Sequence, residues 1–264
     1  YQINPRNGKA LTIGPIGFER CGGMDFDPDG VLFATCERTD GIDTTVLVNI
    51  NTLTGIGTEV GPTGINSSIG DISFRNSDGV LFAYDGFSDP EHTIYIINTL
   101  TGQAELVGDT GFSDASGNGM MFTQSDNLVQ SPSRGGIPML YQINQVTGQS
   151  SFMKELAVIN APPPLVNYRL SGLDIVPGSG QIYGILNDSR GNQGQFGPMY
   201  LATLDIQAGV ITVIGQTADG MDAIAFRSEA APIPTLSGIG SVVLAFVLLS
   251  TLVWVFKRNK NIRV

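Results

Sequence analysis

Short runs of alternating apolar and polar residues recur from Tyr1 to Asp222, and most of them come in pairs joined by a glycine turn. One pair is Tyr95-Ile96-Ile97-Asn98 and Gln103 to Gly108, joined at Thr101-Gly102. Alternation of period two predicts a half-buried β-strand, and two such runs around a tight glycine turn predict a hairpin. This pattern predicts an all-β fold.

The hairpins form a repeat of about 47 residues, because their turn glycines are 47, 47, 46 and 61 residues apart. A second kind of hairpin lies between consecutive copies of the first. Four short strands at this period are typical of one blade of a β-propeller. The turn glycines of the first hairpin are Gly8, Gly55, Gly102, Gly148 and Gly209. The second hairpin begins at Gly23, Gly70, Gly119 and Gly172, and Gly220 begins a fifth copy.

We name the strands of a blade a, b, c and d from the axis outward. The repeat supplies five a strands and five c strands but only four b strands. We therefore expect at least five four-stranded blades over residues 1–229, with the missing b strand ahead of Tyr1. The first residue is not Met and no signal segment follows it, so we also expect this ectodomain to be truncated at its N-terminus. An open pair of β-sandwich sheets is the alternative architecture.

The last part of the chain has a different pattern. Residues 236–256 contain no Asp, Glu, Lys or Arg, and as a helix this run would be roughly 30 Å long, the thickness of a bilayer core. A cluster of basic residues follows at once and favours the cytoplasmic side of a membrane. We expect one transmembrane helix over 236–256, a basic cytoplasmic tail over 257–264 and an ectodomain outside the cytoplasm. The basic residues of the tail are Lys257, Arg258, Lys260 and Arg263.

The segment 230–235 reads as a linker that leads into a short motif, Ile233-Pro234-Thr235-Leu236. Together with the span and the basic end, this motif resembles the IPTL-CTERM variety of PEP-CTERM tails, which bacterial exosortases recognise. Gly238 and Ile239 stand where many such tails have Glu and Trp. The resemblance implies a signal, export, a transient membrane anchor, and processing by an exosortase-type enzyme to a secreted, cell-surface or matrix form. A plain single-span anchor is the alternative.

Charge restricts the classes of partner. The chain has 14 Lys and Arg and 24 Asp and Glu, and four of the basic residues lie in the tail, so the ectodomain carries 10 basic and 24 acidic residues, a net charge of −14. Nucleic acid demands a basic face, so we expect no nucleic-acid partner. Extracellular polysaccharide and surface proteins remain as expected partners.

The longest predicted loops lie on the face formed by the b–c and d–a connections. Tyr168 and Arg169 follow a run of three prolines in one of them, and Arg190 and Phe196 lie in another. Aromatic and arginine side chains on variable loops suit recognition, so we expect binding loops here. The alternative is that these loops are tolerated insertions.

Four acidic residues, Asp25, Asp71, Asp174 and Asp222, align at one position of the predicted a strands, with Met121 in the remaining repeat. They would ring the channel, where carboxylates either accept backbone N–H groups that lock blade to blade or hold a cation such as calcium. We expect the structural role and no resident cofactor.

Other chemistry is sparse. Cys21 and Cys36 flank the first a–b hairpin, and we expect them to form a disulfide rather than two free thiols. His92 is the single histidine and no nucleophile motif accompanies it, so we expect a solvated loop residue and no catalytic group. Two cysteines and one distant histidine do not favour a metal site.

These features favour a non-enzymatic surface protein that binds, adheres or assembles matrix through its loops. The alternative is a propeller hydrolase or lyase that acts on extracellular glycans with carboxylates as acid and base. A third hypothesis is a structural spacer with no ligand-sized pocket.

Overall fold

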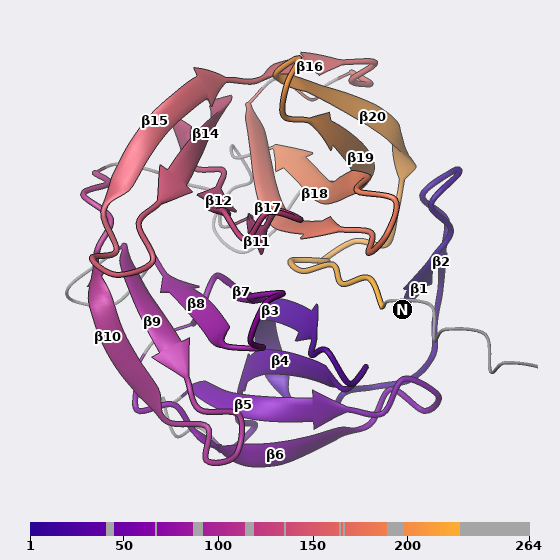
Figure 1. The fold of residues 1–264 in the computed structure, drawn as a ribbon. Coiled ribbons are helices and arrows are strands. Elements are labelled where there is room, and N and C mark those ends of the chain that lie inside the picture. Colours follow the sequence, from indigo (N-terminus) through magenta and orange to yellow (C-terminus); the bar gives the residue numbers. More distant parts are fainter. Residues whose placement is uncertain are drawn as a thin grey trace, which may run out of the picture. The chain divides into compact units, whose positions relative to one another are not determined.

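The computed structural model describes residues 1–40, 45–66, 68–86, 92–113, 119–134, 136–163, 165, 167–188 and 198–227. In these residues every regular element is a β-strand. Four sheets of mainly antiparallel strands stand around a common centre as the blades of a propeller (Figure 1). The predicted all-β propeller architecture is thereby confirmed.

The first two blades are continuous in sequence and have the predicted order a, b, c, d from the centre outward. The first blade consists of β3 (Glu19–Phe26), β4 (Leu32–Glu37), β5 (Thr45–Ile50) and β6 (Gly57–Pro62). The second blade consists of β7 (Asp71–Phe74), β8 (Leu81–Asp85), β9 (Thr93–Ile97) and β10 (Ala104–Asp109).

The third and fourth blades keep this order, and each gains one short extra strand. The third blade consists of β11 (Met120–Phe122), β12 (Leu128–Gln130), β14 (Ile137–Ile143) and β15 (Ser150–Glu155), with β13 (Ser133–Arg134) paired to β14. The fourth consists of β17 (Tyr168–Ile175), β18 (Ile182–Asp188), β19 (Tyr200–Asp205) and β20 (Val210–Gln216), with β16 (Ala157–Ile159) parallel to β20.

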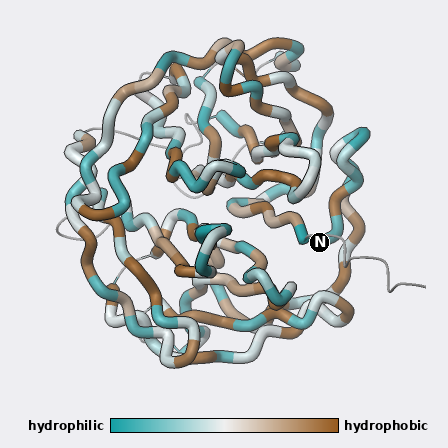
Figure 2. Tube along the Cα trace, in the orientation of Figure 1, coloured by the Kyte–Doolittle hydropathy of each residue, from teal (hydrophilic) through white to brown (hydrophobic). Residues whose placement is uncertain are grey.

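The core lies between neighbouring blades. The b strands are almost wholly buried because both of their faces pack on other blades, whereas the outer strands alternate between apolar and polar residues (Figure 2). An aromatic residue of a b strand packs on the a strand of the next blade. The ring centroids of Phe33 and Phe74 are 5.5 Å apart, and those of Phe82 and Phe122 are 5.3 Å apart. Such tilted and edge-on contacts add to the burial energy of both rings.

The a strands meet at the centre. Strand β7 contacts β3 and β11 on either side and also β17. The centre is therefore occupied by strands and side chains at this level, and the predicted ring of carboxylates does not line an open channel there.

The expected fifth blade is not four-stranded in the described residues. The first repeat supplies only a two-stranded sheet, β1 (Gln2–Ile3) and β2 (Ala10–Leu11), and residues 220–227 form no assigned strand.

Candidate functional site

Three carboxylates lie buried near the centre, on the a strands of three blades. Asp25, Asp71 and Asp174 are 8%, 1% and 6% exposed. Each accepts the N–H of the residue that follows it and an N–H from a neighbouring blade. Asp25 Oδ2 accepts from Phe74 N at 2.7 Å, Asp71 Oδ2 from Met120 N at 2.8 Å, and Asp174 Oδ2 from Phe226 N. Hydrogen bonds from backbone N–H groups to these buried carboxyl oxygens hold adjacent blades in register.

The alignment of the four acids at one strand position was wrong. Asp25 and Asp174 are equivalent, because each pairs with the second residue of its b strand, Phe33 and Tyr183. Asp71 pairs with Tyr84, the fourth residue of β8, so it lies two residues further along. Ser73 takes the place of Asp25 in the second blade. The sequence pattern did not reveal this shift, because strand pairing makes Gly23 equivalent to Asp71 itself and not to Gly70, the glycine that precedes it.

Burial dominates the electrostatics of this group. It raises the pKa of Asp25 to about 7, although the Phe74 and Phe26 N–H groups oppose the rise. Burial also raises the pKa of Asp71 and of Asp174, and the nearby Asp25 charge adds to both shifts. Carboxylates whose oxygens already accept backbone donors are poorly suited to general acid–base chemistry on a substrate.

A second polar group lies where β17 and β18 of the fourth blade reach the loop face. Arg169 Nε donates to Asn187 Oδ1 at 3.2 Å, and Arg169 Nη2 is 3.8 Å from Asp222 Oδ1. Burial lowers the pKa of the Arg169 guanidinium, and the Asp222 charge opposes this. Burial raises the pKa of Asp222, against the Arg169 charge and the Ser171 hydroxyl. Asp222 is thus a partner of arginine and not a fourth member of the central group.

Several buried polar atoms beside this pair lack a hydrogen bond within the described residues. They are both side-chain heteroatoms of Gln130, the Ser131 hydroxyl and Asn187 Nδ2, and all three residues are 0% exposed. The two blades meet here, since Ser131 N donates to the Gly119 carbonyl and Gly119 N donates to the Leu170 carbonyl. Unpaired buried polar atoms are costly, and they are a mark of sites that await a ligand or water. We call Gln130, Ser131, Arg169, Asn187 and Asp222 the loop-face cluster.

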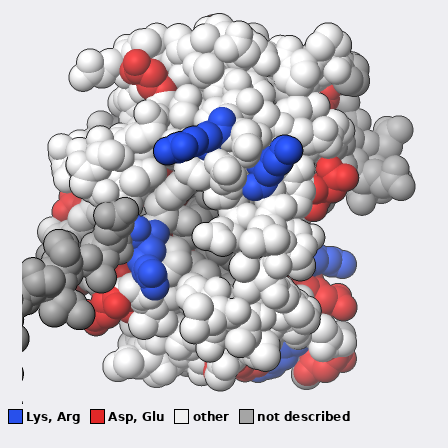
Figure 3. Space-filling model, turned by 90° about the vertical axis from the view of Figure 1, so that its right-hand side faces the viewer, with Lys and Arg blue, Asp and Glu red and all other residues white. Residues whose placement is uncertain are grey.

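A groove of about 1260 Å³ opens between the β1–β2 hairpin, the first blade and residues 220–227. Its lining is largely apolar and includes Ile3, Met24, Phe26 and Met221. Figure 3 faces this side of the propeller, where basic side chains (blue) and acidic side chains (red) are scattered over a mainly uncharged surface. Arg20 lines the groove and pairs with Glu37, whose carboxylate also accepts the Ser68 hydroxyl.

Comparisons with solved structures find β-propellers. A putative TolB from Agrobacterium tumefaciens is 11% identical with a TM-score of 0.50, and the match covers 77% of this chain and 68% of that one. A putative gluconolactonase (15% identity, TM-score 0.47, 78% and 66% covered) and a PQQ-bound aldose sugar dehydrogenase from Streptomyces coelicolor (15%, 0.44, 82% and 74%) are also similar. The likeness shows the fold alone. Protein-family models and curated proteins give no match.

Such a fold hosts unrelated activities, so function has to be argued from the sites of this propeller. The residues predicted as binding loops divide into two groups. Tyr168 and Arg169 belong to β17 rather than to a loop, and the Tyr168 carbonyl accepts the Ser133 hydroxyl at 2.6 Å. Arg190 and Phe196 lie outside the described residues, as do the sorting motif, the predicted span and the basic tail. Within the described part of the chain, no helix has the length and apolar character that crossing a bilayer requires.

His92 is buried, so the expectation of a solvated loop residue was wrong. It is 6% exposed, Tyr84 Oη lies 2.7 Å from its Nδ1, and its ring packs edge-on against Phe112. Its backbone φ of 60° is left-handed, a conformation in which histidine is enriched among non-glycine residues. The described residues contain no group of three or more His, Cys, Asp or Glu side chains placed to hold a metal ion.

Cys21 and Cys36 form a disulfide in the structure, with Cα atoms 4.0 Å apart. Simple pairing of the hairpin from Asp27 and Gly30 would place these residues directly opposite. The register is instead shifted by one, with Gly23 opposite Thr35, and a bulge between Glu19 and Gly23 restores the approach of the two cysteines.

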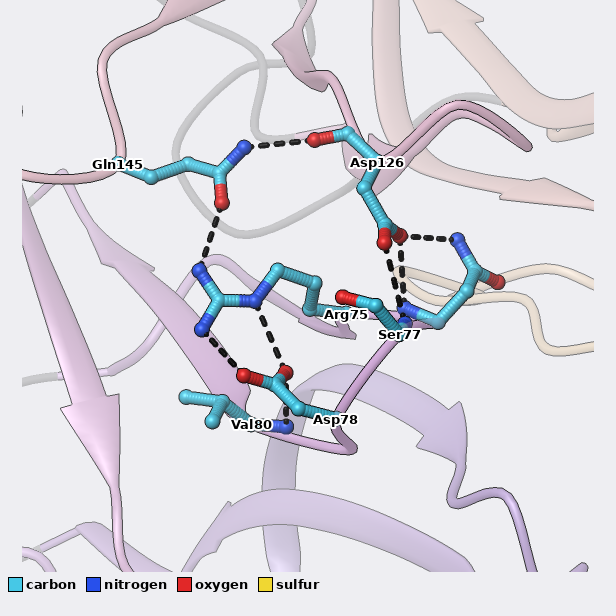
Figure 4. A network of polar contacts seen from close by, with 7 residues as sticks. Arg75, Ser77, Asp78, Val80, Asp126 and Gln145 are labelled. Carbon is cyan, nitrogen blue, oxygen red and sulfur yellow. Dashed lines mark hydrogen bonds and ion pairs between the residues drawn. The ribbon is translucent and has the colours of Figure 1, made fainter.

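The opposite face, made by the short turns, carries a polar network that the sequence did not reveal (Figure 4). Arg75 contacts Asp78 through two nitrogens at 2.9 and 2.6 Å and donates to Gln145 of the third blade at 2.8 Å. Asp126 accepts from the N–H groups of Asn76 and Ser77. The network ties the turns of the second and third blades together, and its one sequence signal is Asp126 in a turn position that the other blades give to glycine.

Proposed function

We propose that this chain is a non-enzymatic β-propeller, displayed outside the cytoplasm, that binds extracellular polysaccharide at the loop-face cluster. The observation that carries the proposal is the set of buried amide and hydroxyl groups of Gln130, Ser131 and Asn187 that have no hydrogen-bond partner in the described residues. A ligand rich in hydroxyl groups would supply the missing partners. The buried Arg169–Asp222 pair next to them would orient it.

The extracytoplasmic location rests on different observations. The disulfide between Cys21 and Cys36 is typical of an oxidising compartment. The uncharged run 236–256 followed by basic residues is typical of an anchor with its N-terminal side outside. The resemblance of Ile233-Pro234-Thr235-Leu236 to exosortase motifs supports processing by an exosortase-type enzyme and transfer to the surface or matrix.

A glycan hydrolase or lyase is less well supported. Such enzymes need two carboxyl groups roughly 5 to 10 Å apart in an open cleft. The three central carboxylates are buried, and each accepts a backbone N–H from a neighbouring blade. Their geometry suits the blade-locking role.

Binding is tested by calorimetric titration of the full chain with dextran oligosaccharides as a neutral probe and alginate oligosaccharides as an acidic one. Gln130→Met and Asn187→Ala should each weaken binding at least tenfold, because each removes polar atoms that the ligand is expected to pair. Gln149→Met is the matched control, since Gln149 is an exposed residue of the same blade. Equal affinity in all variants would contradict this site, and no binding of either probe would favour the spacer hypothesis. Product release from either glycan would favour the enzyme.

Location is tested by intact mass and fractionation of the protein from its host. A surface or matrix form that ends near Ile233 to Leu236 would support sorting. An uncut chain in the membrane fraction would support a plain anchor instead.

A further inference from the structure

The β1–β2 hairpin occupies the place of a c–d hairpin in the ring. Gly57 N of the first blade donates to the Ile16 carbonyl at 2.9 Å, just as Ala104 N donates to Thr63 at 3.0 Å one blade further on. On its other side the hairpin touches the fourth blade. Gly215 of the fourth blade lies against the hairpin turn, since a Cβ atom added there would be 2.5 Å from the Asn7 carbonyl oxygen. Gly61 of the first blade approaches the second blade in the same way, since its Cβ atom would be 2.2 Å from the Thr101 carbonyl oxygen. The hairpin therefore forms the outer half of a fifth blade.

Residues 220–227 occupy the place of the a strand in the same blade. Phe226 N donates to Asp174, as Phe74 N donates to Asp25. The Phe226 ring also packs on Tyr183 of the preceding b strand, with centroids 5.0 Å apart. This repeats the packing of Phe74 on Phe33.

The apolar groove lies between these two parts, where a complete blade has its b strand. Strand β1 pairs with β2 alone in the described residues, so its inner edge is open. Phe26 lines the groove and is the first blade's equivalent of Phe74 and Phe122. Those two rings are 6% and 1% exposed under an aromatic residue of the preceding b strand, whereas Phe26 is only partly buried.

We propose that the groove seats a fifth b strand, supplied by the same polypeptide on the N-terminal side of β1, and that this strand closes the ring. In every complete blade the b strand comes just ahead of the c strand in the sequence, with only the short β13 between them in the third blade. A strand tied to β1 in this way has a high effective concentration at the groove. The inference is independent of the proposed ligand.

The other b strands define the chemistry of the occupant. Three of the four begin with an aliphatic residue and then Phe or Tyr, as in Leu32-Phe33, Leu81-Phe82 and Ile182-Tyr183. The b strand of the third blade begins with Leu128-Val129 instead. We expect an extended segment whose aromatic or β-branched second residue covers Phe26, with main-chain hydrogen bonds to β1 on one side and to residues 221–226 on the other.

Hydrogen exchange of the protein isolated from its host tests the inference directly. Amides of residues 2–3 and 221–226 should exchange as slowly as those of β5 and β3, because a seated strand satisfies them. Exchange at least a hundredfold faster than in β5 would overturn the proposal. A mature protein whose mass shows nothing ahead of Tyr1, or slow exchange only in the presence of a second protein, would overturn the covalent source.

A second experiment uses the chain from Tyr1 to Val264 and a peptide with the sequence of residues 79–86. Peptide at 100 times its Kd should raise the Tm by about 5–10 °C, since it stabilises the folded state alone. The matched peptide with Asp in place of the residue corresponding to Phe82 should have no effect. Equal shifts with both peptides, or with neither, would count against the groove as a strand seat.

Discussion

Substitution of Asp71 by alanine removes the most extensively bonded of the central carboxylates. Asp71 accepts the N–H groups of Ile72 at 2.9 Å, Met120 at 2.8 Å and Leu173 at 3.4 Å. These donors come from three different blades, and the Asp71 side chain is fully enclosed. Alanine leaves them without an acceptor in a place that water does not reach.

The magnitude follows from the cost of unpaired donors. A buried N–H without an acceptor costs about 1–3 kcal/mol, and the long bond from Leu173 adds little. The substitution also removes the free-energy cost of burying the carboxyl group, and this offsets part of the loss from the unpaired N–H groups. We expect Asp71→Ala to lower the free energy of unfolding by about 2–4 kcal/mol, which corresponds to roughly 5–15 °C in Tm for a domain of this size.

The loss should depend on pH. Burial raises the pKa of Asp71 in the folded state, so its contribution is fully present below its unfolded pKa and is lost as pH rises through the folded value. Asp71→Ala should therefore cost more at pH 4 than at pH 8. Asp71→Asn, which keeps one acceptor oxygen, should fall between alanine and wild type.

Urea unfolding followed by circular dichroism measures this series. Asp29→Ala is the control, because Asp29 is exposed in the β3–β4 turn and its loss should change stability by less than about 0.5 kcal/mol. If Asp71→Ala were no more destabilising than Asp29→Ala, the blade-locking role would be refuted. A change in cation binding without a change in stability would refute it as well.

Three further predictions concern other parts of the propeller. In the wild type the free energy of unfolding should fall as pH rises from 4 to about 7, because the folded state retains the Asp25 proton that the unfolded chain has lost. Asp25→Asn should remove this contribution, which is at most about 1.4 kcal/mol per pH unit. An unchanged slope in urea titrations at several pH values would contradict this. Reduction of the Cys21–Cys36 disulfide, which spans 15 residues, should lower the free energy of unfolding by about 3 kcal/mol. Calorimetry should show this as a lower Tm with reductant. The double variant Cys21→Ser with Cys36→Ser should have the same lower Tm without reductant. Gly61→Ala should lower the free energy of unfolding by more than about 1 kcal/mol, because its Cβ would meet the Thr101 carbonyl of the next blade. Thr58→Ala on the same strand is the control and should be nearly neutral. Similar melting curves for the two variants would show that the blades adjust freely.

The repeat of alternating strands and glycine turns was sufficient to predict the propeller, the order of strands in each blade and the absence of a b strand for the hairpin at Tyr1. These are local properties, because alternation sets which face of a strand is buried and turn glycines set where a hairpin reverses. The cysteine pair was also predictable from spacing, within one residue of register.

The positions of individual polar groups depended on tertiary structure. Asp25 and Asp71 look equivalent in the repeat, but strand pairing places Asp71 two positions further from the a–b turn, where its carboxyl meets the amides of two other blades. Burial of His92 depends on Tyr84 and Phe112, which belong to other strands or loops. The pairing of Arg169 with Asp222 joins the fourth blade to the chain's last described segment. Contacts between residues so far apart in sequence are set by how blades pack, which no local pattern encodes.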